Sequence, residues 1–276
     1  MSSPLPPDAD LTTLVDVWES AHDDLLALLD SLDDEQWSAA TDLPGWSVAD
    51  VVAHITWLEL WLMGDVEPSH EPDWSTLPHA DSDKAKFMET PVDRRRSWSR
   101  EEVMAETRET LQRRLASLRA DYSDKDEPYE GPFGPGNIGG LVRQRTFDTW
   151  AHEQDIRRAV GKAGGLDSDG AQASATQLMP GLGKIVGKGA SAQPGESVRF
   201  VVTEPGVVFD VAIVVGDDGR ARMVESVEGP TATLTMPYES FILATCGRAA
   251  EWRSTVVVEG DDDLADRVLS SMTLTP

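Results

Sequence analysis

The chain has 276 residues, with 49 acidic and 24 basic side chains and a formal net charge of −25. This acidity argues against a general nucleic-acid binder, which needs a basic face for phosphate contacts, and against docking on an anionic membrane surface. Hydrophobic residues make up 40% of the chain, which is enough for a packed core in one large domain or two ordinary ones. Acidic runs such as Asp261–Asp263 are interpreted as solvated surface.

Several features indicate a cytoplasmic protein. No apolar run approaches the roughly 18–20 residues of a membrane span, and the first seven residues have neither the basic region nor the apolar stretch of a secretory signal. Cys246 is the sole cysteine, so the sequence predicts no internal disulfide and no cysteine-rich zinc site.

Helical periodicity dominates the chain up to about residue 190. Apolar residues recur at three- and four-residue steps, and Ser47 with Asp50 and Ser99 with Glu102 have the spacing of N-terminal capping boxes. Predicted helices cover residues 11–32, 47–64, 82–90, 99–120, 138–160 and 167–187. Pro180 is expected to break the last of these, and the stretch 128–140, rich in Gly and Pro, is predicted to be irregular.

Beyond residue 193 the period changes to two, which is typical of strands and hairpins. Predicted strands cover residues 198–202, 207–215, 220–227, 231–236 and 254–259, with helices over 238–245 and 261–271. The sequence therefore predicts an α+β protein, with a bundle of four or five helices over residues 1–190 and a small α/β domain over residues 191–276.

Three side chains on two predicted helices form a candidate metal site. Asp148 and His152 are four residues apart, so they project from one helix face about one turn apart. Such a carboxylate and imidazole can bind one metal ion together, and His54, within another apolar helix, is the candidate third ligand. Three protein ligands with open positions are the arrangement that catalytic zinc uses.

Other interpretations of these residues stay open at this point. A histidine on an apolar helix face is more often a core residue than a ligand, and Asp148 could instead stabilise the charge or tautomer of His152. Asp155 could be a ligand, a partner of a ligand or a salt-bridge residue. Three other histidines are expected at the surface, namely His22, His70 and His79. Five tryptophans either line a pocket or belong to the core, namely Trp46, Trp57, Trp61, Trp74 and Trp150.

Two motifs carry a family resemblance. The stretch 43–54, LPGWSVADVVAH, resembles the opening motif of the mycothiol-dependent maleylpyruvate isomerase family, a branch of the DinB-like metal-binding helical bundles. The stretch 145–157, RTFDTWAHEQDIR, resembles the second motif of that family. Residues 234–237 and 245–248 are similar to the sterol-carrier-like α/β domain that follows the bundle, so the resemblance covers nearly the whole chain.

The resemblance implies a divalent metal, usually zinc, held by His54, Asp148 and His152. The acidic ligand of the isomerase is typically Glu, whereas this chain has the shorter Asp148, which would reach the metal directly or through water. The resemblance also implies mycothiol as the thiol cosubstrate. Arg248, from the second domain, is then either a catalytic-site residue that receives a substrate carboxylate or a member of a surface ion pair.

The leading hypothesis is a metal-dependent, mycothiol-using isomerase or S-transferase, in which a metal-bound thiolate adds to a small electrophilic substrate. One alternative is a metal-dependent hydrolase with the same three ligands and metal-bound water as the nucleophile. The other is a non-catalytic module that binds a metal or a small molecule. The expected partner is a small-molecule substrate, with no nucleic acid and no membrane, and the protein is expected to be a monomer or a homodimer.

Overall fold

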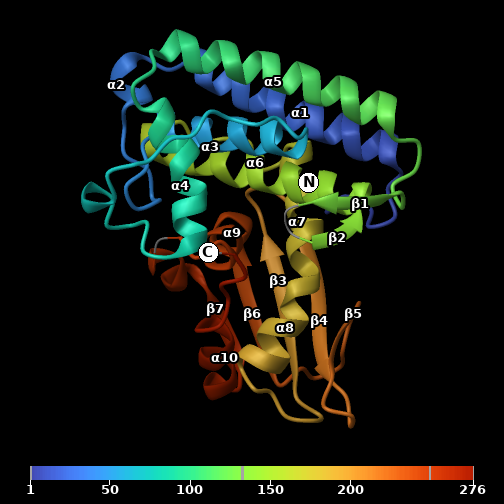
Figure 1. The fold of residues 1–276 in the computed structure, drawn as a ribbon. Coiled ribbons are helices and arrows are strands. Elements are labelled where there is room, and N and C mark those ends of the chain that lie inside the picture. Colours follow the sequence, from blue (N-terminus) through green and yellow to red (C-terminus); the bar gives the residue numbers. More distant parts are fainter. Residues whose placement is uncertain (1, 132–133, 249, 276) are drawn as a thin grey trace. The chain divides into compact units, whose positions relative to one another are not determined.

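Figure 1 shows the computed structural model of the chain, which describes residues 2–131, 134–248 and 250–275. The chain divides into two compact units, Ala9–Gly164 and Gly165–Pro276, the latter together with Met1–Asp8. The first unit is helical and the second is built around a sheet, so the predicted α+β class is confirmed. In the part of the chain that the structure describes, no helix is long and apolar enough to cross a membrane.

The units divide at Gly164 and Gly165, whereas the sequence predicts a domain boundary near residue 190. The difference arises because the helix that follows Gly165 is tied to the sheet-containing unit. The hydroxyl of Tyr238 donates a hydrogen bond of 2.6 Å to the carbonyl oxygen of Ala171 in that helix. Helical periodicity cannot reveal such a long-range contact, so the sequence pattern groups this helix with the preceding ones.

The helical unit matches most of the predicted elements. Its elements in chain order are α1 Leu11–Asp30, α2 Asp34–Trp37, α3 Val48–Leu62, a 3₁₀ turn Trp74–Thr76, α4 Asp83–Arg95, α5 Arg100–Asp121, β1 Pro128–Gly131, β2 Gly134–Asn137 and α6 Ile138–Val160. Both predicted capping boxes are present, at Ser47 with Asp50 and at Ser99 with Glu102. These caps define where α3 and α5 begin, because each satisfies backbone N–H groups that lack a partner within the helix.

Helix packing in this unit buries one apolar cluster. Helix α1 packs on α6, and α3 packs on both α4 and α5; α1 and α5 run side by side in Figure 1. The cluster includes Leu25 and Leu29 from α1, Val51 and Ile55 from α3, and Ile156 from α6, all fully buried. Burial of each such side chain contributes about 1.5–3 kcal/mol, so this cluster holds α3 and α6 at close range.

The stretch predicted to be irregular forms a hairpin instead. Strands β1 and β2 pair antiparallel, from Pro128 opposite Asn137 to Gly131 opposite Gly134. Periodicity could not reveal it because every residue of β2 is exposed and the strands carry no alternating apolar pattern. Gly134 has a φ of +97°, which a residue with a side chain would adopt only with strain. The two residues at the tip, 132 and 133, lie outside the described part of the chain.

The second unit contains a five-stranded sheet. Its elements are α7 Asp169–Leu178, a 3₁₀ turn Met179–Gly181, α8 Leu182–Lys184, a π turn Ile185–Gly189, β3 Ser197–Thr203, β4 Phe209–Val215, β5 Ala221–Val224, β6 Ala232–Pro237, α9 Tyr238–Thr245, a 3₁₀ helix Ala250–Thr255, β7 Val257–Gly260 and α10 Asp262–Leu269. The helix predicted over 167–187 is broken near Pro180, as expected.

The sheet has the strand order β5-β4-β3-β6-β7, with β3 parallel to β6 and every other pair antiparallel. The predicted period of two is present in β3, where Val198, Phe200 and Val202 are buried and alternate with half-buried residues. Helices α9 and α10 both pack against β6. The core of this unit therefore lies between the sheet and these helices.

His22, expected at the surface, is buried in the helical unit. Its Nδ1 lies 2.7 Å from the carbonyl oxygen of Trp18, and its Nε2 lies 3.0 Å from the hydroxyl of Thr149 on α6. The spacing of four residues from Trp18 and three from Leu25 places it on the buried face of α1. The surface prediction is therefore wrong. It gives more weight to the acidic residues next to His22 in the sequence than to the helical spacing that places His22 on the apolar face.

Burial lowers the pKa of His22 from its ordinary value of 6.5 to about 4. As the pH falls, His22 is therefore protonated in the unfolded chain before it is protonated in the folded chain. The stability that the buried, neutral imidazole contributes is lost as the pH falls from 6.5 toward 4. We expect the lost contribution to reach about 3 kcal/mol. The free energy of unfolding of wild type and His22→Gln, measured against pH by urea denaturation, should converge as the pH falls. Parallel pH profiles for the two proteins would contradict this assignment.

Candidate metal centre

Helix α3 carries the first candidate ligand. Ser47 caps the helix, and its backbone N–H donates to Asp50 Oδ2 at 2.8 Å while its hydroxyl accepts from the Asp50 N–H at 3.3 Å. His54 follows near the end of the second turn, with 6% of its surface exposed. Nearly all of its helical neighbours are apolar and buried, so the imidazole is held in place by packing.

Helix α6 carries the other two candidate ligands. The helix begins after Asn137, whose side chain accepts a hydrogen bond from the Gly140 N–H, and ends at Gly161, with a φ of +68°. Asp148 and His152 lie between these caps, and the predicted spacing of four residues places both on one face.

The structure brings the three candidate side chains together. One ligand atom from each of His54, Asp148 and His152 lies within 4.8 Å of the other two. Asp148 Oδ2 is 3.9 Å from His54 Nε2, and Asp148 Oδ1 is 3.8 Å from His152 Nε2. The imidazole rings meet edge to face, with centroids 5.2 Å apart. No other group of three such residues within reach of one ion occurs in the described ranges.

These distances fit a divalent cation. Donor atoms about 2.0–2.2 Å from a tetrahedral zinc ion lie about 3.3–3.6 Å from one another, so small movements would close the group around an ion. The separations exceed hydrogen-bond length, and His54 Nδ1 is buried without a hydrogen-bond partner among the described residues. The donor set of two imidazoles and one carboxylate is one that zinc favours.

The protonation states also suit metal ligands. Burial lowers the pKa of His54 to about 3, although the charge of Asp148 opposes the shift. The imidazole is therefore neutral at pH 7 and its lone pair is available. Burial by itself would raise the pKa of Asp148, but the nearby charge of Arg145 outweighs it and the pKa is lowered. Asp148 is thus a carboxylate at neutral pH.

A buried chain of charged groups lies beside Asp148. Arg145 Nη1 donates to Asp148 Oδ2 at 2.7 Å, and Arg145 Nε donates to Glu59 Oε1 at 2.7 Å. Arg114 on α5 approaches the other oxygen of Glu59 at 3.3 Å. Periodicity and spacing do not predict this arrangement, although Glu59 is the only acidic residue, and no Lys or Arg occurs, in the largely apolar stretch between Asp50 and Asp65. That isolated charge was the available signal.

Asp155 contacts the side of His152 that faces away from the candidate site. Its Oδ2 lies 3.2 Å from His152 Nδ1, and its Oδ1 accepts from Arg158, which also donates to Asp42 at 2.8 Å. Of the three roles left open for Asp155, the contact with His152 fits a partner of a candidate ligand, and the contact with Arg158 fits a salt-bridge residue. A carboxylate in this place holds the proton on Nδ1 and leaves the Nε2 lone pair free.

Trp46 covers one side of His54. The two rings are 4.9 Å apart between centroids, and the indole N–H donates to Glu89 Oε2 at 2.7 Å. Glu89 is buried and also contacts His79 and Arg96. Residues from the loop before α3, from the 65–82 loop and from α4 therefore meet at one carboxylate, which the sequence pattern could not predict.

The remaining predicted positions fall into three groups, one of which consists of the half-buried Trp61 and Trp74. Trp57 and Trp150 are core residues, as the less specific interpretation expected. His70 and His79 are half-buried and pair with Asp93 and Glu89, at 2.7 and 3.0 Å.

Arg248 belongs to the other unit, where its Nη1 donates to the carbonyl oxygen of Cys246 at 2.7 Å. Its role in binding a substrate carboxylate stays a prediction.

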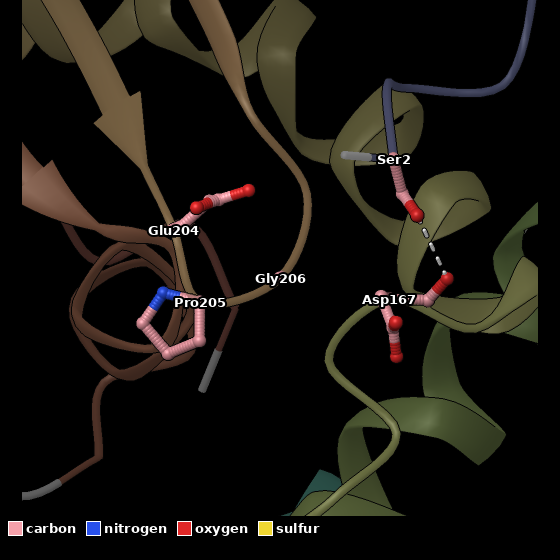
Figure 2. Close-up of a pocket in the computed structure, with 5 residues that line it drawn as sticks. All are labelled: Ser2, Asp167, Glu204, Pro205 and Gly206. Atoms are coloured by element: carbon pink, nitrogen blue, oxygen red, sulfur yellow. Dashed lines mark hydrogen bonds between the residues drawn. The ribbon is translucent and has the colours of Figure 1, made fainter.

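A separate depression lies within the sheet-containing unit (Figure 2). Its volume is about 490 Å³, and Ser2, Asp167, Glu204, Pro205 and Gly206 line it. The Ser2 hydroxyl donates to the carbonyl oxygen of Asp167 at 3.1 Å. None of the sequence-predicted site residues lines this depression, which presents two carboxylates without a histidine.

Comparison with known proteins identifies the family. The family described as the mycothiol maleylpyruvate isomerase N-terminal domain matches residues 18–157, which are just over half of the chain. The chain belongs to this family. The resemblance predicted from the two motifs is therefore confirmed. The matched residues 18–157 include all three candidate ligands.

Individual relatives extend the comparison. Uncharacterized proteins from two strains of Mycobacterium tuberculosis are 27% identical over 162 residues, which are 58% of this chain. The chain spans about 59% of the length of these curated relatives. A crystal structure of the mycothiol-dependent maleylpyruvate isomerase has a TM-score of 0.53. A crystal structure of a histidine-to-alanine mutant of this isomerase has a TM-score of 0.57. Each is 12% identical and covers 91% of this chain and 94% of its own, so this likeness concerns the fold.

Replacement of a candidate ligand should separate metal binding from folding. We expect His152→Ala to lose zinc while the protein stays folded, because His152 does not belong to the apolar cluster that packs α1, α3 and α6 together. Zinc content by elemental analysis and helicity by circular dichroism would be measured on the same sample. His70→Ala, which removes a half-buried histidine paired with Asp93, is the control and should keep its zinc. Unchanged zinc content in His152→Ala would refute the ligand assignment.

A second variant tests the contact between Asp155 and His152. Asp155→Asn keeps the size of the side chain but removes the charge that orients the imidazole, so zinc affinity should fall about 10–100-fold. Competition with a chelator would give the dissociation constant. Asp42→Asn is the matched control, because Asp42 contacts Arg158 and its loss should leave affinity within about twofold. Equal affinities for both variants would mean that Asp155 does not support the site.

Proposed function

We propose that this protein is a mycothiol-dependent isomerase or S-transferase that acts on a small electrophile at the site of His54, Asp148 and His152. The observation that carries the proposal is the convergence of these three side chains within 4.8 Å in a member of the mycothiol maleylpyruvate isomerase family. Family membership alone supports the fold and the use of mycothiol. The grouped ligands support a site at which the thiol could react.

Two imidazole nitrogens and one carboxylate oxygen would hold a divalent cation, for which zinc is the best match to this donor set. When bound, such a cation supplies positive charge that keeps a coordinated thiol as thiolate at neutral pH. His54, Asp148 and His152 would hold the cation, and the sulfur of mycothiol is proposed to bind on the side that these three side chains leave open.

The three candidate ligands differ in how far their side chains are exposed. Asp148 is the most exposed of them, at 29% for its side chain against 8% for His54 and 10% for His152. A cosubstrate would therefore approach past Asp148, while the buried imidazoles form the inner wall. Trp46, whose indole N–H donates to Glu89, covers one side of His54.

The proposed chemistry begins with addition of the thiolate to a conjugated double bond. A carbon–sulfur bond forms and the π electron pair moves onto the conjugated carbonyl oxygen. Rotation about the resulting single bond and elimination of the thiolate would complete an isomerisation and return the thiol unchanged. Uptake of a proton and release of the adduct would complete an S-transfer and consume the thiol. Arg248 is the proposed partner of a carboxylate on the substrate.

Thiol dependence tests this proposal. We expect zinc-loaded protein to convert maleylpyruvate, or a related conjugated electrophile, only in the presence of mycothiol. Product formation and free thiol would be measured together: constant thiol indicates isomerisation, and loss of one thiol per product indicates S-transfer. His152→Ala loaded under the same conditions is the control without a complete site. Turnover at equal rate without any thiol would contradict the proposal and favour a hydrolase that uses water.

A further inference from the structure

The guanidinium of Arg145 stands between two carboxylates with different surroundings. Glu59 on α3 is completely buried, whereas the side chain of Asp148 is 29% exposed and belongs to the candidate metal site. Arg145 itself is 3% exposed and donates to one oxygen of each, at 2.7 Å in both cases. A single planar cation thus connects the interior of the bundle to a candidate ligand.

Arg145 is held firmly on the side away from the metal site. Its partner Glu59 is buried and is approached by Arg114 from α5, so two cations share one carboxylate. Moving the guanidinium away from Glu59 is costly, because a charge-assisted hydrogen bond would be lost in the interior, and Arg114 approaches Glu59 Oε2 without forming a hydrogen bond. Arg145 therefore cannot follow Asp148 outward, and its Nη1 is a fixed point for the Asp148 carboxylate.

The two oxygens of Asp148 have different surroundings. Oδ2 accepts the hydrogen bond from Arg145 and lies 3.9 Å from His54 Nε2, while Oδ1 lies 3.8 Å from His152 Nε2. A metal cation on Oδ2 would lie close to the guanidinium and be repelled by it. A cation on Oδ1 is farther from that charge and next to the imidazole.

We infer that Arg145 is a positioning residue that presents Asp148 to the metal through one oxygen, Oδ1. The inference rests on the metal site of the proposed function and adds the ligand mode to it. The short side chain of Asp148 suits this arrangement, because it has only two rotatable bonds and one charge-assisted hydrogen bond to Oδ2 restrains both.

A double-mutant cycle with zinc alone tests the inference. Arg145→Lys keeps the positive charge, but a single ammonium group cannot reproduce the two directed bonds to Glu59 and Asp148. We expect zinc affinity, measured by chelator competition without any thiol, to fall about 10–100-fold in this variant. In an Asp148→Ala background, the same Arg145→Lys change should alter affinity by less than about twofold, because the group it orients is gone.

A matched control separates positioning from general damage. Arg95 is equally buried, with Glu67 and Glu106 as its two carboxylate partners, but it contacts none of the three candidate ligands. Arg95→Lys should lower the melting temperature by an amount similar to Arg145→Lys and leave zinc affinity unchanged. The Co²⁺ absorption spectrum should also change in Arg145→Lys, because Oδ2 becomes free to coordinate, and stay as in wild type in Arg95→Lys.

The possible outcomes distinguish the positioning role of Arg145 from the proposed function. An equal loss of zinc affinity from Arg145→Lys with and without Asp148 would overturn the positioning role and leave the proposed function standing. Tighter zinc binding by Arg145→Lys would also overturn it, because Arg145 would then compete with the metal for Asp148. Failure of wild-type protein to bind zinc at all would overturn the inference and the proposed function together. Zinc binding as expected, without thiol-dependent turnover, would remove only the proposed function.

Discussion

The burial of Arg145 between Glu59 and Asp148 is the constraint around which the helical unit is organised. A guanidinium taken out of water needs carboxylate partners, and those partners come from α3 and from α6 itself. The ion pair therefore fixes which turns of α3 and α6 face one another. Apolar packing would bring α3 and α6 together without specifying which residues face one another, whereas the directed bonds of an arginine do specify it.

The charged residues of this protein divide into two populations. Its net charge of −25 comes from carboxylates on the surface, where excess charge of one sign keeps proteins soluble. The buried carboxylates, by contrast, are matched by arginines, as at Glu59 and at Glu89, which contacts Arg96. The net charge is therefore a poor guide to the interior, where nearly neutral clusters shape the surroundings of His54 and Asp148.

Much of the architecture can be predicted from local sequence signals, because caps and periodicity act over a few residues. The capping box at Ser47, the αL residue Gly161 at the end of α6 and the alternation in β3 are all signals of this kind. The family can also be predicted, since each of its two motifs is one continuous stretch of sequence.

The features that sequence patterns miss depend on contacts between distant positions. Arg145 and Glu59 are 86 residues apart in sequence, and Trp46 reaches Glu89 from a different segment. His22 is misplaced when its acidic neighbours are given more weight than its position on the buried face of α1. Helical spacing relates only residues of the same helix, so it pairs Asp148 with His152 but leaves the approach of His54 a hypothesis until the packing of α3 on α6 is known.

Two distances of different origin determine the size of the candidate site. Asp148 and His152 are carried by one run of backbone hydrogen bonds in α6, so the distance between them follows from helical pitch and hardly varies. The distance to His54 depends instead on how far α3 can slide along α6, and the bond between Glu59 and Arg145, five residues further along α3, restricts that sliding. A cation of larger radius would have to stretch this buried bond to push His54 outward. If the candidate site binds a metal, discrimination by ionic size would therefore depend on a contact that does not itself touch the ion.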